Sequence, residues 1–274
     1  MAAVSRTVLV TGSTDGVGRR VAERLAQTGT TVLVHGRDRA RGAQTLAAIR
    51  TAGGTGMFYP ADLSSLSEVR RLAEAVQHDH RRLDVLINNA GIGFGEPGAI
   101  RQLSQDGYEL RFAVNYLSGF LLTRLLLPLL EATGSSRIIN VASAGQEPID
   151  FTDVMLTRNY TGVRAYRQSK LAQIMFTFDL AEDHEASRTV ATCLHPATFM
   201  DTTMVRSAGI APVSTVDEGA DAILHLAESA EMAARTGLYF DGLRPSRAHS
   251  QAYDRAARQR LRALSFQLVG LPQP

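Results

Sequence analysis

The chain has 274 residues and a formal net charge of +2, from 29 lysine and arginine residues against 27 aspartate and glutamate residues. This balance gives no field for a polyanion, so we expect no nucleic-acid partner. The single cysteine, Cys193, excludes an internal disulfide and a cysteine-based zinc cluster, and it suits the reducing cytoplasm that we predict as the location. The seven histidines show no metal-ligand spacing, so we predict no metal site.

Strand and helix patterns alternate along the whole chain. The first strand, residues 6–11, ends in a glycine-rich turn and is followed by a helix over 18–29. Further strands are expected at 30–36, 56–63, 83–91, 136–145, 188–196 and 236–242, with helices at 39–54, 64–80, 108–134, 161–184 and 216–229. Apolar strands joined by long helices imply a parallel sheet covered on both faces. We therefore predict an α/β fold, a doubly wound parallel (Rossmann) sheet of about seven strands.

We interpret residues 1–274 as a single domain, because the sequence contains no repeat, low-complexity tract or linker. Residues 146–161 show no clear periodicity, and loops of that length are usually functional or mobile, so we place them on the substrate side. A basic helix over 248–268 is expected to present a solvated face. The most apolar stretch, 116–132, is interrupted by Arg124 and Pro128, which predicts a buried helix and no membrane span.

The turn after the first strand carries Gly12, Gly16 and Gly18. Glycine permits a tight turn and close approach of a pyrophosphate, and the free N–H groups at a helix start bind the anion. The position of this turn, directly after a strand and opening a helix, predicts dinucleotide binding.

The end of the second strand indicates which dinucleotide is bound. An acidic residue there would accept the ribose 2′-OH of NAD, whereas an arginine accommodates the 2′-phosphate of NADP. Here His35 and Gly36 are followed by Arg37, which predicts NADP(H). Asp38 keeps NAD(H) as the less favoured alternative, because a small loop shift could turn it toward the ribose.

Several motifs together resemble the short-chain dehydrogenase/reductase family over nearly the whole chain. They are TGSTDGVG (11–18), ADL with Asp62, NNAG (88–91), VNYLSGF with Asn115, INVAS with Ser143, and YRQSK with Tyr166 and Lys170. The resemblance implies cofactor contacts from Gly12, Ser13, Thr14, Asp15, Gly16, Val17, Gly18, Arg37, Asp62, Leu63, Asn89, Ala90, Gly91, Tyr166, Lys170, Pro196, Thr198 and Phe199.

Within that family the sequence is most similar to the retinol-dehydrogenase-like branch. The long gap between Ser143 and Tyr166 and the phrases SKLAQIMFTFDLA and LHPATFMDTT carry this resemblance. The chain departs from the family pattern at Ala197, where a glycine is usual, and at Asp201, where a threonine is usual.

The chemistry that the family resemblance implies centres on Tyr166 and Lys170, the only lysine in the chain. Tyrosine has a reference pKa of about 10, and an ammonium one helical turn away is expected to lower it toward working pH. Ser143 would hydrogen-bond the substrate oxygen where negative charge develops. Asn115 would hold a water in a proton relay, and Lys170 would also bind the nicotinamide ribose.

The predicted activity is that of an NADP(H)-dependent oxidoreductase acting on a carbonyl/alcohol pair. The alternatives are a non-catalytic NADP-binding sensor with the same fold, or an NAD-linked alcohol dehydrogenase. Apolar residues in loops at the carboxyl edge favour a hydrophobic ketone or aldehyde. The candidate substrate contacts are Ser143, Tyr166, Phe94, Met155, Met200 and Met204, with Gly93 and Phe199 beside them. A homodimer is predicted through the helices 108–134 and 161–184.

Overall fold

The structure is a computed structural model that describes residues 6–96, 98–183 and 188–273. Its centre is one sheet of eight strands in the order β3-β2-β1-β4-β5-β6-β7-β8. The strands are β1 (Thr7–Val10), β2 (Thr31–Gly36), β3 (Thr55–Pro60), β4 (Val85–Asn88), β5 (Ser136–Val141), β6 (Thr189–His195), β7 (Leu238–Asp241) and β8 (Arg244–Ser246). Strands β1 to β7 are parallel, which confirms the predicted fold class. The sequence predicted about seven strands; the eighth, β8, is a short exposed strand antiparallel to β7.

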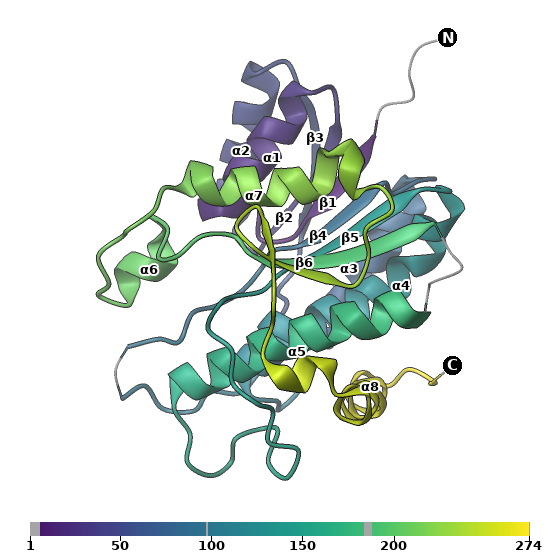
Figure 1. The fold of residues 1–274 in the computed structure, drawn as a ribbon. Helices are drawn as coiled ribbons and strands as arrows, with labels where there is room; N and C mark the ends of the chain where they lie inside the picture. The colour runs from purple at the N-terminus through teal and green to yellow at the C-terminus, as the bar shows by residue number, and fades with distance from the viewer. Residues whose placement is uncertain (1–5, 97, 184–187, 274) are drawn as a thin grey trace.

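Helices cover both faces of this sheet (Figure 1). They are α1 (Gly16–Gln27), α2 (Arg39–Thr51), α3 (Leu66–Asp79), α4 (Ser118–Ala132), α5 (Gly162–Asp183), α6 (Thr203–Ser207), α7 (Val216–Glu228) and α8 (Arg255–Val269), with short helices η1 (Phe112–Leu117), η2 (Ala230–Met232) and η3 (Ser250–Tyr253). Alternate residues of each strand face opposite layers. Val8 and Val10 pack into the core beneath α1 and α7, and Leu9 packs into the core beneath α3, α4 and α5.

The C-terminal helix begins later than the pattern indicated. Asp254 accepts hydrogen bonds from the backbone N–H groups of Ala256 and Ala257, so α8 starts at Arg255 and the preceding residues form η3. The predicted end of the α5 helix at His184 lies outside the described residues, within which α5 extends to Asp183.

Helix α8 packs on α5, and its Phe266 ring meets Phe120 of α4 edge to face with 5.2 Å between centroids. The Arg124 guanidinium lies 5.4 Å from the Phe120 ring and 5.1 Å from the Phe266 ring. Arg262 of α8 lies 3.6 Å from Asp179 of α5. Helix α8 therefore covers one face of α4 and α5, the two helices that were expected to pair between subunits. The expectation of a solvated basic face on α8 is wrong where Arg262 and its buried neighbour Arg258 meet α5.

Residues 146–161 are irregular but held by specific contacts. The backbone N–H of Ile149 donates to Gln251 Oε1 at 2.7 Å, and the Gln146 side chain accepts from the backbone of His249 at 2.7 Å. The Asp153 carboxylate accepts from the backbone N–H of Thr157 at 2.8 Å. The first two bonds attach the segment to the region before α8, and the third stabilises the segment internally.

One stretch, Phe112–Ala132, is long and apolar enough by length and composition to cross a membrane. In this fold, 67% of its most apolar window is buried inside the protein. The core helix of a globular protein passes the same test of length and hydropathy.

Candidate active site

The glycine turn between β1 and α1 is shaped by its neighbour, the NNAG segment. Gly12 has a φ of 64°, and a Cβ there would lie 2.8 Å from the Cα of Ala90. At Gly18 a Cβ would lie 2.2 Å from Nδ2 of Asn89. The Thr11 hydroxyl oxygen accepts from the backbone N–H groups of Asn89 and Ala90, both at 3.0 Å. Only glycine fits at these two positions, so the turn leaves its backbone open at the start of α1, where a helix binds phosphate.

His35 supports this turn, and our reading of the sequence had not assigned it a role. Its Nδ1 accepts from the Gly12 backbone N–H at 3.0 Å, which leaves Nε2–H to donate to the Ala61 carbonyl at 3.2 Å. Burial lowers the pKa of His35 to about 4, so the ring is neutral and can accept. The sequence feature that could have indicated this role is a histidine near the end of an otherwise apolar strand.

The carboxyl end of β2 holds the residues that distinguish the two dinucleotides. A Cβ on Gly36 would lie 2.5 Å from the Thr14 hydroxyl oxygen, so Thr14 and the strand end are in contact. The Arg37 side chain is 71% exposed and lies 3.9 Å from Asp62. Asp38 accepts from the backbone N–H groups of Ala40 and Arg41 and so caps α2. The Asp38 carboxylate is therefore engaged by the helix.

Asp15 and Val17 connect the glycine turn to later parts of the chain. Asp15 accepts from its own neighbour Gly16 at 2.8 Å, from the Arg41 guanidinium at 3.1 Å and from the Thr203 hydroxyl at 3.0 Å. Val17 packs toward Gly219 of α7. The turn thus contacts α2, α6 and α7.

Ser143 follows β5 and meets Tyr166 of α5. The Ser143 hydroxyl oxygen accepts from the Gly145 backbone N–H at 3.0 Å, which leaves its O–H free to donate. Burial raises the pKa of Tyr166, and the hydrogen bond with Ser143 opposes this rise. Tyr166 is consequently protonated at neutral pH.

Lys170 lies one helical turn from Tyr166, and its ammonium is hydrogen-bonded to other groups. Its Nζ donates to the Val141 carbonyl at 2.8 Å and to Gln173 Oε1 at 2.9 Å, and it lies 5.7 Å from the Tyr166 ring centroid. Burial lowers the pKa of Lys170 to about 7, because a buried ammonium has lost its water. The pKa of the Tyr166 phenol is raised, with burial as the largest cause, and the lowering effect expected from the Lys170 charge stays a prediction.

Lys170 nevertheless lies at the junction of the predicted motifs. A Cβ on Gly91 would lie 3.5 Å from Lys170 Nζ and 3.3 Å from the side-chain oxygen of Asn115. Leu63, Ala90 and Asn115 line a cavity of about 10 Å³, the size of one water molecule. The structure thus brings NNAG, the end of β3, Asn115 and Lys170 together.

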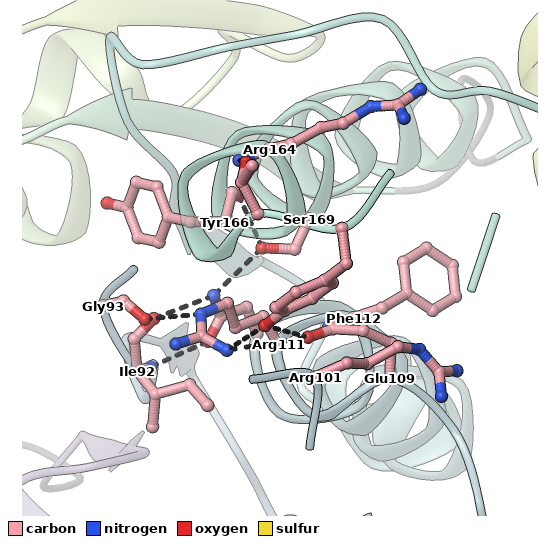
Figure 2. A network of polar contacts seen from close by, with 12 residues as sticks. Ile92, Gly93, Arg101, Glu109, Arg111, Phe112, Arg164, Tyr166 and Ser169 are labelled. Atoms are coloured by element: carbon pink, nitrogen blue, oxygen red, sulfur yellow. Dashed lines mark hydrogen bonds and ion pairs between the residues drawn. The ribbon is translucent and has the colours of Figure 1, made fainter. Parts of the chain in front are cut away.

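Asn115 lies in η1, a π-helical turn, a feature frequent at functional sites. Its side-chain oxygen accepts from the Ile92 backbone N–H at 2.8 Å, and its Nδ2 donates to the Ile92 carbonyl at 3.1 Å and to Ser169 Oγ at 2.9 Å. Figure 2 shows two of these partners, Ile92 in its loop and Ser169 on helix α5. The amide donors of Asn115 are committed to protein groups, so it fixes the loop.

The substrate-wall candidates divide into two groups. The Phe94 ring meets Tyr166 edge to face, with 5.8 Å between centroids, and Met204 lies beside Gly93. In contrast, the Met200 sulfur packs against Gly219 of α7, and Met155 packs against the core with its carbonyl bonded to Arg101. Phe94 and Met204 are therefore the candidates nearest the loop beside Tyr166.

The segment after β6 holds the last predicted cofactor residues, Pro196, Thr198 and Phe199. Thr198 Oγ1 lies 3.0 Å from Nε2 of His195, and its carbonyl accepts from the Ser214 hydroxyl. Phe199 has a φ of 44°, which is strained for a residue with a side chain, and it is half-exposed.

Comparison with known proteins identifies the family of this chain. The family model for short chain dehydrogenase matches residues 6–211. The chain belongs to the short-chain dehydrogenase family.

Among curated relatives, the chain is 35% identical to retinol dehydrogenase 13 of Homo sapiens, over 98% of this chain and 86% of that protein. It is 34% identical to retinol dehydrogenase 14 of Mus musculus, over 97% of this chain and 86% of that protein. The retinol-dehydrogenase-like branch is thereby confirmed.

Solved structures share the fold. An uncharacterized protein from Mycobacterium paratuberculosis superposes with a TM-score of 0.81 at 32% identity, covering 98% of this chain and 95% of that one. The Pseudomonas aeruginosa RhlG/NADP active-site complex has a TM-score of 0.70 at 28% identity, covering 87% and 95%.

Proposed function

We propose that this chain is an NADP(H)-dependent oxidoreductase that interconverts a hydrophobic ketone or aldehyde and the corresponding alcohol. The observation that carries the proposal is the place of Tyr166, whose ring meets Phe94 edge to face at 5.8 Å between centroids and lies 5.7 Å from Lys170 Nζ. Membership of a dehydrogenase family supports the reaction class.

The protein's part in the reaction is to supply a proton and orient the substrate. When bound, the nicotinamide cofactor supplies the hydride for reduction or accepts it for oxidation. Tyr166 holds a proton at its hydroxyl oxygen, and it donates this proton to the alkoxide that forms when a carbonyl is reduced. The Ser143 O–H donates to the same substrate oxygen, where negative charge develops. Oxidation of an alcohol uses the same proton in the opposite direction.

The residues around the glycine turn fit a dinucleotide. Gly12 and Gly18 keep the cradle free of side chains, and the start of α1 would hold the pyrophosphate. Lys170, next to Gly91, would bind the nicotinamide ribose with its ammonium donors. We propose these contacts because backbone N–H groups suit a pyrophosphate and an ammonium suits ribose hydroxyls.

The preference for NADP rests on the end of β2. Arg37 is 71% exposed at the end of β2 and lies 3.9 Å from Asp62, a contact that it would exchange for a 2′-phosphate, whereas Asp38 is engaged by the start of α2. The RhlG structure from Pseudomonas aeruginosa, 28% identical to this chain, is a complex with NADP. The proposed preference for NADP(H) over NAD(H) therefore depends on Arg37 in this chain.

A cytoplasmic location and a homodimer complete the proposal. The buried free thiol of Cys193 supports a reducing compartment. Because α8 covers one face of α4 and α5, a dimer through these helices would use another of their faces, and sedimentation velocity measures the oligomeric state directly.

The test of the proposed function is NADPH consumption, followed at 340 nm, over aliphatic, aromatic, steroid and retinoid carbonyls. Turnover is expected with a hydrophobic carbonyl, and Tyr166→Phe should abolish it while NADPH binding, measured by fluorescence titration, persists. Substantial turnover by Tyr166→Phe would contradict the role of the phenol. Tight NADPH binding without turnover on any carbonyl would favour the non-catalytic sensor.

A further inference from the structure

A buried arginine that the reaction does not use lies next to the site. Arg111 is 5% exposed, and its guanidinium makes three contacts. Nε donates to the Gly93 carbonyl at 2.8 Å, Nη1 donates to the Tyr160 hydroxyl at 2.7 Å, and Nη1 lies 3.7 Å from Glu109 Oε1 (Figure 2). A buried ion pair contributes little to net stability, because desolvation offsets the attraction. What distinguishes Arg111 is that its two hydrogen bonds reach the loop at Gly93 and the hydroxyl of Tyr160.

Glu109 holds Arg111 in place. Its Oε2 accepts from the Phe112 backbone N–H at 2.7 Å, at the start of η1, and its Oε1 accepts from the Tyr160 hydroxyl at 3.4 Å. The Glu109 side chain is 1% exposed. The acid therefore balances the charge of Arg111 and also fixes the direction of its guanidinium.

Arg111 and Asn115 hold consecutive residues of one loop. They are four positions apart, which places them on one side of the helical segment. Asn115 bonds both backbone groups of Ile92, and Arg111 bonds the carbonyl of Gly93. The residue that follows these two anchors is Phe94.

The other side of the loop rests on the first turn of α5. A Cβ at Gly162 would lie 1.9 Å from the Phe94 carbonyl oxygen and 3.4 Å from Arg111 Nη2. The Phe94 ring then meets Tyr166, one turn further along α5, at an interplanar angle of 85°. The loop is thus clamped between Arg111 and α5.

We propose that Arg111 is a positioning residue that, through Gly93, fixes Phe94 against Tyr166 and so sets the width of the substrate site. The inference rests on the proposed function. Through Tyr160, Arg111 also ties residues 146–161 to the same loop, so one guanidinium aligns two walls of the site. The fixed ring of Phe94 would orient a hydrophobic carbonyl substrate, and the substrate would not touch Arg111.

The test compares Arg111→Met and Tyr160→Phe with a control, Arg124→Met. Arg124 is as buried as Arg111 but lies between α4, α5 and α8, so it controls for the loss of a buried guanidinium. With hexanal and benzaldehyde as probes, Arg111→Met should raise KM at least about tenfold, because a misplaced wall costs orientation. NADPH Kd should stay within about twofold.

Hydrogen exchange gives a readout that is independent of turnover. Amide protection of the peptide 92–96 should fall at least about tenfold in Arg111→Met and stay unchanged in Arg124→Met. Tyr160→Phe keeps the ring, so it should also raise KM and lower amide protection, each by a smaller factor than Arg111→Met. In the double variant Arg111→Met/Tyr160→Phe, the change in each quantity should be smaller than the product of the two single-variant changes, because both residues belong to one network.

The inference is overturned if Arg111→Met and Tyr160→Phe match Arg124→Met in loop protection. It is equally overturned if the loop loosens but KM for both aldehydes is unchanged in an active enzyme. A wild-type protein that reduces neither aldehyde while Arg111→Met loosens the loop would contradict the proposed activity and support the clamp.

Discussion

Lys170 gives a prediction whose size can be worked from its surroundings. Burial lowers its pKa from 10.5 to about 7, a difference worth about 5 kcal/mol at about 1.4 kcal/mol per pH unit. Below pH 7 the Lys170 amine is charged in both the folded and the unfolded chain, so the burial of its charge lowers the free energy of unfolding by the full amount. Between pH 7 and 10.5 the unfolded chain holds the proton and the folded chain does not, so the free energy of unfolding rises with pH.

The comparison is between the wild type and Lys170→Met, by urea unfolding from pH 7 to pH 9. We expect the contribution of Lys170 to raise wild-type stability by about 2 kcal/mol over these two pH units, because half of the folded-state amine is already deprotonated at pH 7, and we expect Lys170→Met to lack this rise. The window ends at pH 9 because tyrosines titrate above it.

The pKa can also be measured directly. Lys170 is the only lysine, so protein labelled with ¹³C at lysine Cε should give one side-chain signal that titrates near pH 7. A titration near pH 10, or parallel unfolding curves for the two proteins, would refute the reasoning about burial.

Other predictions concern Arg37, His35 and Asp254. Arg37→Ala should raise KM for NADPH at least about tenfold more than KM for NADH, because it removes a charged hydrogen bond to phosphate; equal effects would reject NADP preference. The folded pKa of His35, about 4, lies below the unfolded 6.5, so its contribution of about 3 kcal/mol is complete above pH 6.5 and lost toward pH 4. Urea unfolding of His35→Gln should lack that loss, and an identical acid profile would exclude His35 as its source. Asp254→Ala should cost about 1 kcal/mol in thermal unfolding by uncapping α8, and an unchanged Tm would argue against the cap.

The strands and helices around the site could be predicted because their signals are local. Apolar runs marked the parallel strands, and the spacing of Tyr166 and Lys170 placed both on one helix. The exposed strand β8 gave no such signal, because Arg244–Ser246 has no apolar face. The π-helical turn at Asn115 was also missed, since a 3.6-residue period was assumed throughout.

The electrostatics of the site could not be predicted from spacing. One helical turn separates Tyr166 and Lys170 in the chain, but the ammonium is drawn to Val141 and Gln173. The pairing of Arg111 with Gly93 and Tyr160 likewise depends on segments 18 and 49 residues away. Burial and such distant partners decide pKa values, and both appear only when the chain is folded.

The position of α8 has a consequence for the nascent chain. Roughly 90 residues separate the end of α5 from the end of α8, and synthesis at about 5–20 residues per second takes roughly 5 to 18 s to deliver them. During that interval the Phe120 and Phe176 rings and the carboxylate of Asp179 have no cover from α8. A ribosome-associated chaperone therefore has several seconds in which to bind this surface before the domain is complete.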